Sequence, residues 1–298
     1  MKFPSRVLIP VLLLAALPAF AQDAPQQALE AANAVYTNGD YPAAAEAYET
    51  LLRDYPTSPV VPNAQVQLAF SYYLSGENQK SLDILGKFLT GPPAGAELSE
   101  LAALLQPQAL SALAASLKAD DPARKTNYEE AVKQFAAFIE EYPQSSEVES
   151  AFYGSAIASF QVGDYAPAQT ALETNLKRFP NSPGILDSQN LLALIFATEA
   201  SKMLGVEGAD QQAAFALYTK SAGLLRAIIE KKTDLALVNT AQFQLGEILL
   251  NEAAFAPADR KPALLEQARN AFRGILPKET IVALQQKKID RIPALRRT

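Results

Sequence analysis

Residues 39–59 read GDYPAAAEAYETLLRDYPTSP, and residues 163–183 read GDYAPAQTALETNLKRFPNSP, nearly the same stretch 124 positions later. Each stretch places a glycine, a small residue 5 positions on, a large apolar residue 4 further on, and a proline 8 beyond that. The same intervals begin at Gly76, and again at Thr126 with threonine in place of the glycine. The steps from 39 to 76 and from 126 to 163 are both 37 residues. Such self-similarity is the signature of a repeat architecture.

Each unit has the pattern of two helices. In the second helix apolar residues recur at helical spacing, and Pro56 ends it because proline cannot continue a helix. Ser58 followed by Pro59 predicts the N-cap and first turn of the next helix. Gly39, Gly76 and Gly163 are expected to form the tight turn inside a unit.

The remaining units are less regular. Residues 98–118 predict a longer first helix interrupted at Pro107, and residues 205–210 predict an expanded loop. Counting the degenerate units at the C-terminal end, we expect about six helix pairs between residues 25 and 277. The predicted organisation is therefore all-α, with one helical repeat domain over residues 22–277.

The second-helix pattern of small residue, aromatic or large apolar residue and terminal proline resembles the tetratricopeptide repeat (TPR). The YPxSP joint and the 37-residue step look like envelope TPR proteins of Gram-negative bacteria, among them the outer-membrane-assembly lipoproteins and the Tol-Pal-associated cell-division coordinators. This sequence has no cysteine for lipidation and no room for an N-terminal coiled coil. The resemblance implies a right-handed α-solenoid whose first helices line a concave groove.

The resemblance also implies a partner-binding groove. Tyr36, Tyr73 and Phe160 hold one repeat position that usually faces the groove, and aromatic side chains there suit a role as anchors for peptide segments. Nearby groove positions are held by Asn33, Phe70, Tyr153 and Gln161. The alternative is that these aromatic rings only pack between helices. Tyr41, Tyr48, Phe135 and Tyr165 lie on second helices and are predicted to be core.

The two ends of the chain predict export and a basic tail. Residues 1–21 have a positive start, a short apolar run and an Ala19-Phe20-Ala21 site, which predicts a signal peptide cleaved after Ala21 and a periplasmic protein. Residues 278–298 carry six basic and two acidic residues. We interpret this tail as a helix that caps the solenoid, as a basic amphipathic element for peripheral contact with an anionic surface or acidic partner, or as the start of a further domain.

Composition excludes several classes of function. The chain has no histidine and no cysteine, which excludes Ser-His-Asp and Cys-His catalysis, disulfides and ordinary zinc sites. Residues 22–277 carry a formal charge of −12, which argues against nucleic acid as a partner. No cofactor, metal site or second membrane-length segment is predicted. One Glu-Ser pair, Glu149-Ser150, resembles a motif of peptidoglycan-cleaving enzymes, but its surroundings do not.

The sequence therefore favours a non-enzymatic periplasmic scaffold that binds envelope proteins or peptide segments, in assembly or maintenance of the cell envelope. Two alternatives stay open at this point. A carbohydrate-binding or polysaccharide-export protein would use the same aromatic rings as stacking platforms, and a peptidoglycan-cleaving enzyme would use Glu149.

Overall fold

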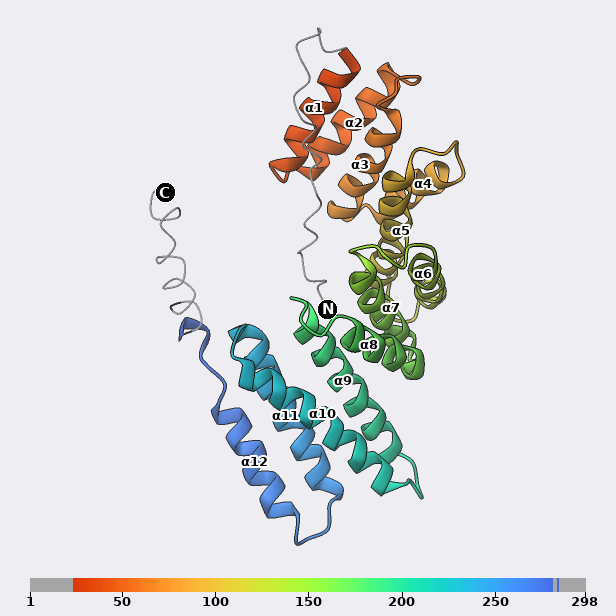
Figure 1. Ribbon diagram of the computed structural model, residues 1–298. Helices are drawn as coiled ribbons and strands as arrows, with labels where there is room; N and C mark the ends of the chain where they lie inside the picture. The colour runs from red at the N-terminus through yellow and green to blue at the C-terminus, as the bar shows by residue number, and fades with distance from the viewer. Residues whose placement is uncertain (1–23, 281–282, 284–298) are drawn as a thin grey trace.

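The computed structural model describes residues 24–280 and Ala283, and within them twelve α-helices form six consecutive antiparallel pairs, while residues 278–280 after the last pair are also helical (Figure 1). The first three pairs are α1 (Ala24–Thr37) with α2 (Tyr41–Asp54), α3 (Val61–Leu74) with α4 (Asn78–Leu89), and α5 (Ala96–Ser116) with α6 (Pro122–Glu141). The other three are α7 (Val148–Val162) with α8 (Tyr165–Arg178), α9 (Ile185–Leu204) with α10 (Gln211–Lys231), and α11 (Leu235–Phe255) with α12 (Lys261–Arg273). The predicted all-α solenoid of about six TPR-like pairs is confirmed.

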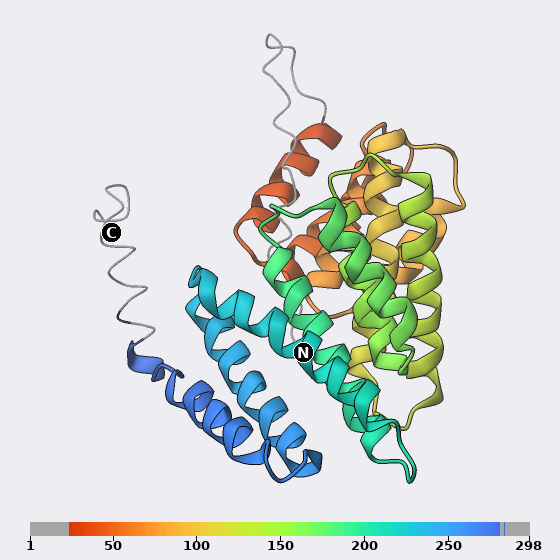
Figure 2. The same ribbon diagram turned by 60° about the horizontal axis from the view of Figure 1, so that its bottom comes forward.

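The pairs stack in chain order and the array bends (Figures 1 and 2). Each helix packs against its neighbours in sequence, and the first helices of successive pairs also touch, as α3 does with α5 and α9 with α11. The first helices therefore form a continuous inner layer, and the second helices cover its other side.

The turns inside the pairs explain the recurring glycines. Gly39, Gly76 and Gly163 all have φ near +83°, a left-handed conformation that disfavours other residues. Thr126, which holds the glycine position of the third unit, lies instead inside α6, because α6 begins earlier at Pro122. The turn of that pair is formed by residues 117–121, and Asp121 caps α6 through the backbone N–H of Ala123 at 2.9 Å.

The expected starts of the first helices need correction. Ser58 does not cap α3, which begins at Val61 after a turn; its hydroxyl accepts a long 3.4 Å bond from the Val60 N–H. Ser182 likewise precedes α9 by three residues and donates to Glu149. The YPxSP joint forms turns before each helix rather than a direct restart. Pro107 does not interrupt α5 but lies buried within one continuous helix.

Small residues let the helices of a pair approach closely. Ala32, Ala69, Ala156 and Ala193 hold one repeat position and are fully buried. Across the pair, the Ser81 hydroxyl donates to the Ala69 carbonyl at 2.8 Å. Ser221, at the matching position of a later unit, donates to the Ala193 carbonyl at 2.6 Å. The repeated contact fixes the same helix spacing in different units.

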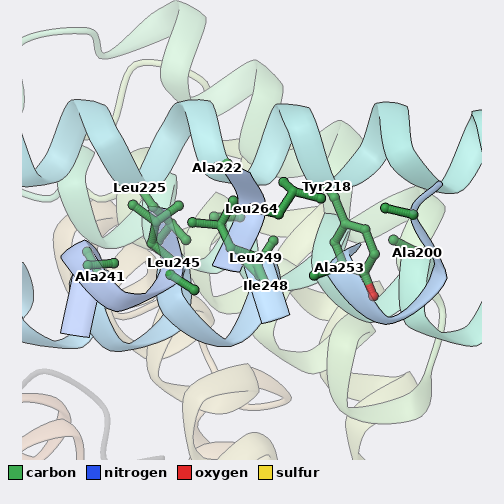
Figure 3. Close-up of a cluster of buried hydrophobic side chains, with 14 of the residues drawn as sticks. Ala200, Tyr218, Ala222, Leu225, Ala241, Leu245, Ile248, Leu249, Ala253 and Leu264 are labelled. Carbon is green, nitrogen blue, oxygen red and sulfur yellow. The ribbon is translucent and has the colours of Figure 1, made fainter. Parts of the chain in front are cut away.

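Large side chains fill the space between the pairs. Tyr48 and Phe135 are fully buried, which confirms two of the predicted core residues, whereas Tyr41 and Tyr165 are half-buried. The C-terminal pairs share one cluster in which Tyr218 and Leu225 of α10 meet Leu245 and Leu249 of α11 (Figure 3). The signal-peptide prediction for residues 1–21 and most of the predicted tail lie outside the described residues.

Candidate functional site

The three aromatic residues predicted to anchor a partner are half-buried on first helices and pack against core clusters of their own and the next unit. The Tyr36 ring meets Tyr41 edge-on with centroids 5.4 Å apart, and the Phe160 ring meets Tyr165 at 5.7 Å. Tyr73 packs against the core cluster of α3, α4 and α5. Tyr41 and Tyr165 hold the same repeat position, so the pairing recurs with the repeat. These contacts cover part of the ring surface that a partner would pack against.

The Tyr36 hydroxyl is buried and has no hydrogen-bond partner among the described residues. Burial, with a smaller contribution from Tyr41, raises the pKa of Tyr36 above its usual value. Tyr153 is also half-buried, and burial together with the nearby Asp187 raises its pKa to about 12. Both hydroxyls therefore remain protonated over the physiological range, and neither is poised for acid–base chemistry.

The predicted polar groove residues already have partners inside the protein. The Tyr48 hydroxyl donates to the Asn33 side-chain oxygen at 2.6 Å. Arg124 donates to the Gln161 side-chain oxygen at 3.1 Å, and the same guanidinium donates to the carbonyls of Ala114 and Leu117. These bonds join first helices to second helices. They leave the two amides less available for hydrogen bonds to a partner backbone.

Phe70 is a core residue. Its side chain is only 4% exposed and packs with Val66, Leu85 and Phe88 between α3, α4 and α5. The prediction that Phe70 lines the groove is therefore wrong, because its helix turns this position toward the next pair.

A pocket of about 270 Å³ does lie on the first-helix face, between α9 and α11. From α9 it is lined by Leu194, Ala197, Thr198 and Ser201, and from α11 by Phe243, Gln244, Glu247, Ile248 and Asn251. We call it the α9–α11 pocket. Ala197 and Thr198 follow Phe160 and Gln161 by one 37-residue step, so the pocket lies on the face predicted for binding, one unit further along.

Ala197 lines the pocket at a position where other units carry an aromatic ring. Ala197 holds the repeat position that carries Tyr36, Tyr73 and Phe160 in three other units. Its methyl group takes up less space than an aromatic ring would. Phe243 also lines the pocket and is 53% exposed, and its ring makes a T-shaped contact with Phe272 at a centroid distance of 6.0 Å.

The pocket also offers polar groups. The Gln244 side-chain oxygen is buried without a hydrogen-bond partner in the described part of the chain. Ser201 shares a 2.9 Å hydrogen bond with the hydroxyl of Tyr218. Glu247 is the charged residue of the lining, and it is exposed. An exposed ring beside an unpaired acceptor and a carboxylate suits an apolar side chain next to N–H donors.

Sequence reasoning missed this site because the last unit is degenerate. The signal that finds it is the repeat register itself, in which alanine replaces an aromatic residue at position 197. Phe243 gives no comparable signal, because the apolar spacing around it predicts only another first helix.

Glu149, the residue that suggested peptidoglycan cleavage, has a structural role. Its carboxylate accepts a hydrogen bond from the Ser182 hydroxyl and lies against Gly184 at the joint before α9. Its backbone carbonyl accepts a 3.4 Å bond from the buried Asn175. It is not the N-cap of α7, which is Glu147. Over the described ranges no cluster of carboxylates suitable for a metal ion occurs.

Comparison with known families agrees with this architecture. Residues 21–147, less than half of the chain, match the family YfiO, described as outer membrane lipoprotein. Over these residues the chain resembles outer membrane lipoproteins of the YfiO type, and its stacked helix pairs are TPR-like. The match covers the regular N-terminal units and stops before the α9–α11 pocket. No curated protein matches the chain.

Solved structures of TPR proteins align with most of this chain. One from Thermus thermophilus is 16% identical, with a TM-score of 0.49, and covers 74% of this chain and 99% of its own. One from Parabacteroides merdae is also 16% identical, with a TM-score of 0.45, and covers 82% of this chain and 98% of its own. Both TM-scores lie below 0.5. The evidence for a TPR-like solenoid is therefore the helix pairing and the repeated contacts of this chain itself. No helix within residues 24–280 has the length and apolar character that crossing a bilayer requires.

Proposed function

We propose that this TPR protein is an exported scaffold of the bacterial cell envelope that binds an extended segment of a partner protein on its first-helix face. The observation that carries the proposal is the α9–α11 pocket, opened by Ala197 at the position where other units carry a ring. The TPR fold favours protein partners, and the resemblance to outer membrane lipoproteins favours an envelope role. The expected signal peptide at residues 1–21 supports periplasmic location.

The binding chemistry follows from the lining. An apolar side chain of the segment would pack on Phe243 and Leu194, with burial contributing roughly 25 cal/mol per Å² of apolar surface. A backbone N–H of the segment would donate to the unpaired Gln244 oxygen. This bond would remove the free-energy cost of a buried acceptor that has no hydrogen bond. Neighbouring Asn251 and Thr198 would orient the backbone. The half-buried Tyr36, Tyr73, Tyr153 and Phe160 would shape the same face rather than anchor the segment.

The alternatives receive less support from the geometry. Sugar stacking needs a free aromatic face, whereas Tyr36 and Phe160 press against Tyr41 and Tyr165. Peptidoglycan cleavage would need the Glu149 carboxylate, which is bound to Ser182. We therefore propose a binding role without a catalytic step.

The test is photo-crosslinking of the chain of residues 22–298 in envelope extract, followed by measurement of the affinity for the segment identified. Two variants attack the pocket: Phe243→Ala removes the exposed ring, and Ala197→Trp fills the space. The matched control is Phe255→Ala, because Phe255 is 46% exposed on the same helix but does not line the pocket.

We expect both pocket variants to lose the crosslink and to weaken binding by on the order of tenfold or more, as for an interface hot spot. The control should keep both. Equal binding by all variants would contradict the pocket assignment. Competition by soluble glycan strands, in place of peptide, would support the carbohydrate alternative instead.

A further inference from the structure

A second depression lies on the second-helix side of the same C-terminal units. It occupies about 300 Å³ between α10 and α12 and is floored by α11. Leu245 and Leu249 of α11 form the apolar floor, with Ile229 on the α10 wall and Ala271 on the α12 wall. We call it the α10–α12 groove. It lies on the opposite face of α11 from the α9–α11 pocket, since Leu245 and Leu249 stand about half a helical turn from Glu247 and Asn251.

Some polar groups of the groove lack a hydrogen-bond or ion-pair partner. Arg226 donates to the Gln267 side-chain oxygen at 3.0 Å, which joins α10 to α12. The Gln242 side-chain oxygen is buried without a partner among the described residues. Glu230 is exposed on the α10 wall and has no ion-pair partner within the part of the chain that the structure describes. An occupant would therefore need an apolar side chain, an N–H donor and a positive charge.

The chain leaves α12 directly beside this groove. Asn239 holds the backbone of Leu276 from both sides: its amide donates to the Leu276 carbonyl at 2.7 Å, and its oxygen accepts from the Leu276 N–H at 2.9 Å. Asn239 lies one turn before Gln242 on α11. The Gln242 amide itself packs on Gly274, where a Cβ would approach its nitrogen to 2.2 Å. Residues beyond 277 thus start within one helical turn of the groove.

The residues that follow offer basic and apolar side chains that could partner the groove. Residues 278–298 hold six basic residues against two acidic ones, while residues 22–277 carry −12. Apolar residues stand among the basic ones, as in Ile289, Ile292 and Leu295. The fifteen residues after Ala283 can span roughly 50 Å if extended, at about 3.3 Å per residue. The wall from Arg226 to Glu230 covers only about 6 Å of helix, at 1.5 Å per residue.

We propose that the α10–α12 groove is the docking site for this chain's own C-terminal segment, residues 284–298. The segment places an apolar side chain over Leu245 and Leu249 and a basic side chain against Glu230. It thereby seals the second-helix face of the last units and leaves the α9–α11 pocket open. The proposal does not depend on the proposed function, because it concerns a different face of α11.

The absence of tryptophan gives a clean probe of the segment. Ile292→Trp in the chain of residues 22–298 places the sole indole in the tail. Its emission and acrylamide quenching are compared with those of a peptide of residues 278–298 that carries the same substitution. Docking predicts emission at shorter wavelength and weaker quenching in the chain than in the peptide.

Charge variants test the assigned contact. Glu230→Lys in the Ile292→Trp chain should shift emission toward that of the free peptide, and further reversal of Lys287, Lys288 and Arg291 to glutamate should restore the docked signal. Glu173→Lys, at an exposed position of α8, is the matched control and should change nothing. Circular dichroism confirms that each variant is folded.

Three outcomes would overturn the proposal. Emission in the chain equal to that of the free peptide excludes docking. A docked signal that Glu230→Lys leaves intact places the segment elsewhere. A signal that grows with protein concentration assigns the groove to the tail of a second copy rather than to the same chain.

Discussion

The side-chain amide of Asn239 binds the backbone of Leu276 by two hydrogen bonds, of 2.7 and 2.9 Å, across 37 positions of sequence. An amide that both donates and accepts in this way satisfies the carbonyl and N–H of one residue beyond the end of α12. It fixes the exit path of the chain against the second turn of α11.

This clamp gives the first prediction. Asn239→Ala should lower the free energy of unfolding by about 2 kcal/mol, because each of the two bonds contributes about 1 kcal/mol. Urea denaturation measures the loss, and amide hydrogen exchange should show faster exchange at Leu276. The neighbouring Thr240→Ala is the control, since Thr240 is exposed and bonds only within its helix. An unchanged exchange rate at Leu276 would show that the clamp does not hold the chain in solution.

The second prediction concerns Gly246, whose lack of a side chain leaves room for the Phe272 ring. A Cβ at Gly246 would lie 2.5 Å from the Phe272 ring, whereas a Cβ at Gly223, also within a helix, would meet nothing within 4 Å. Gly246→Ala should destabilise the chain by roughly 1–3 kcal/mol through overpacking. Gly223→Ala should stabilise it by up to about 1 kcal/mol, because alanine favours helix. Thermal unfolding of the pair measures the contrast, and equal shifts would contradict the packing of α11 on α12.

The third prediction separates two tyrosine hydroxyls of the first unit. Tyr48→Phe should cost about 1 kcal/mol, because it removes the 2.6 Å bond to Asn33. Tyr36→Phe should be neutral or stabilising, because the Tyr36 hydroxyl is buried and has no partner among the described residues. Chemical denaturation of the two variants side by side checks the sign. A larger loss for Tyr36→Phe would mean that its hydroxyl has a partner in solution.

The fourth prediction is a pH dependence at Glu252. Its side chain is 6% exposed and lies 3.0 Å from Arg260. Burial raises the pKa of the Glu252 carboxyl above its ordinary value of 4.5, and the positive charges of Arg260 and Arg226 oppose the rise without cancelling it. Since the folded state favours the protonated form, this group's contribution to stability is full below pH 4.5 and is lost as pH rises through the raised pKa.

Glu252→Gln should therefore be more stable than the parent at pH 7, and the difference should vanish below pH 4.5. Urea unfolding at several pH values measures it. Glu266→Gln is the control, because Glu266 is exposed and its pair with Arg269 is on the surface. A parent protein that gains stability over Glu252→Gln as pH rises would show that the Arg260 pair dominates burial.

Much of the fold followed from the sequence alone. The intervals from Gly39 and Gly163 determined the helix pairs, and the glycines adopt the positive φ expected of them. Full burial of Tyr48 and Phe135 likewise followed from helical spacing. These features are local, since a glycine, a proline or a periodic apolar stripe acts on its own helix.

The tertiary structure decided which side chains are buried between units. Those contacts depend on the relative rotation and shift of neighbouring helices. It buried Phe70 and engaged Asn33 and Gln161 in internal bonds, which a repeat alignment does not reveal. It also turned the alanine at position 197 into a pocket, because an empty position becomes a cavity only when a helix such as α11 lies opposite it. The sequence by itself determined a stack of helix pairs, and side-chain packing between pairs determined where that stack is open.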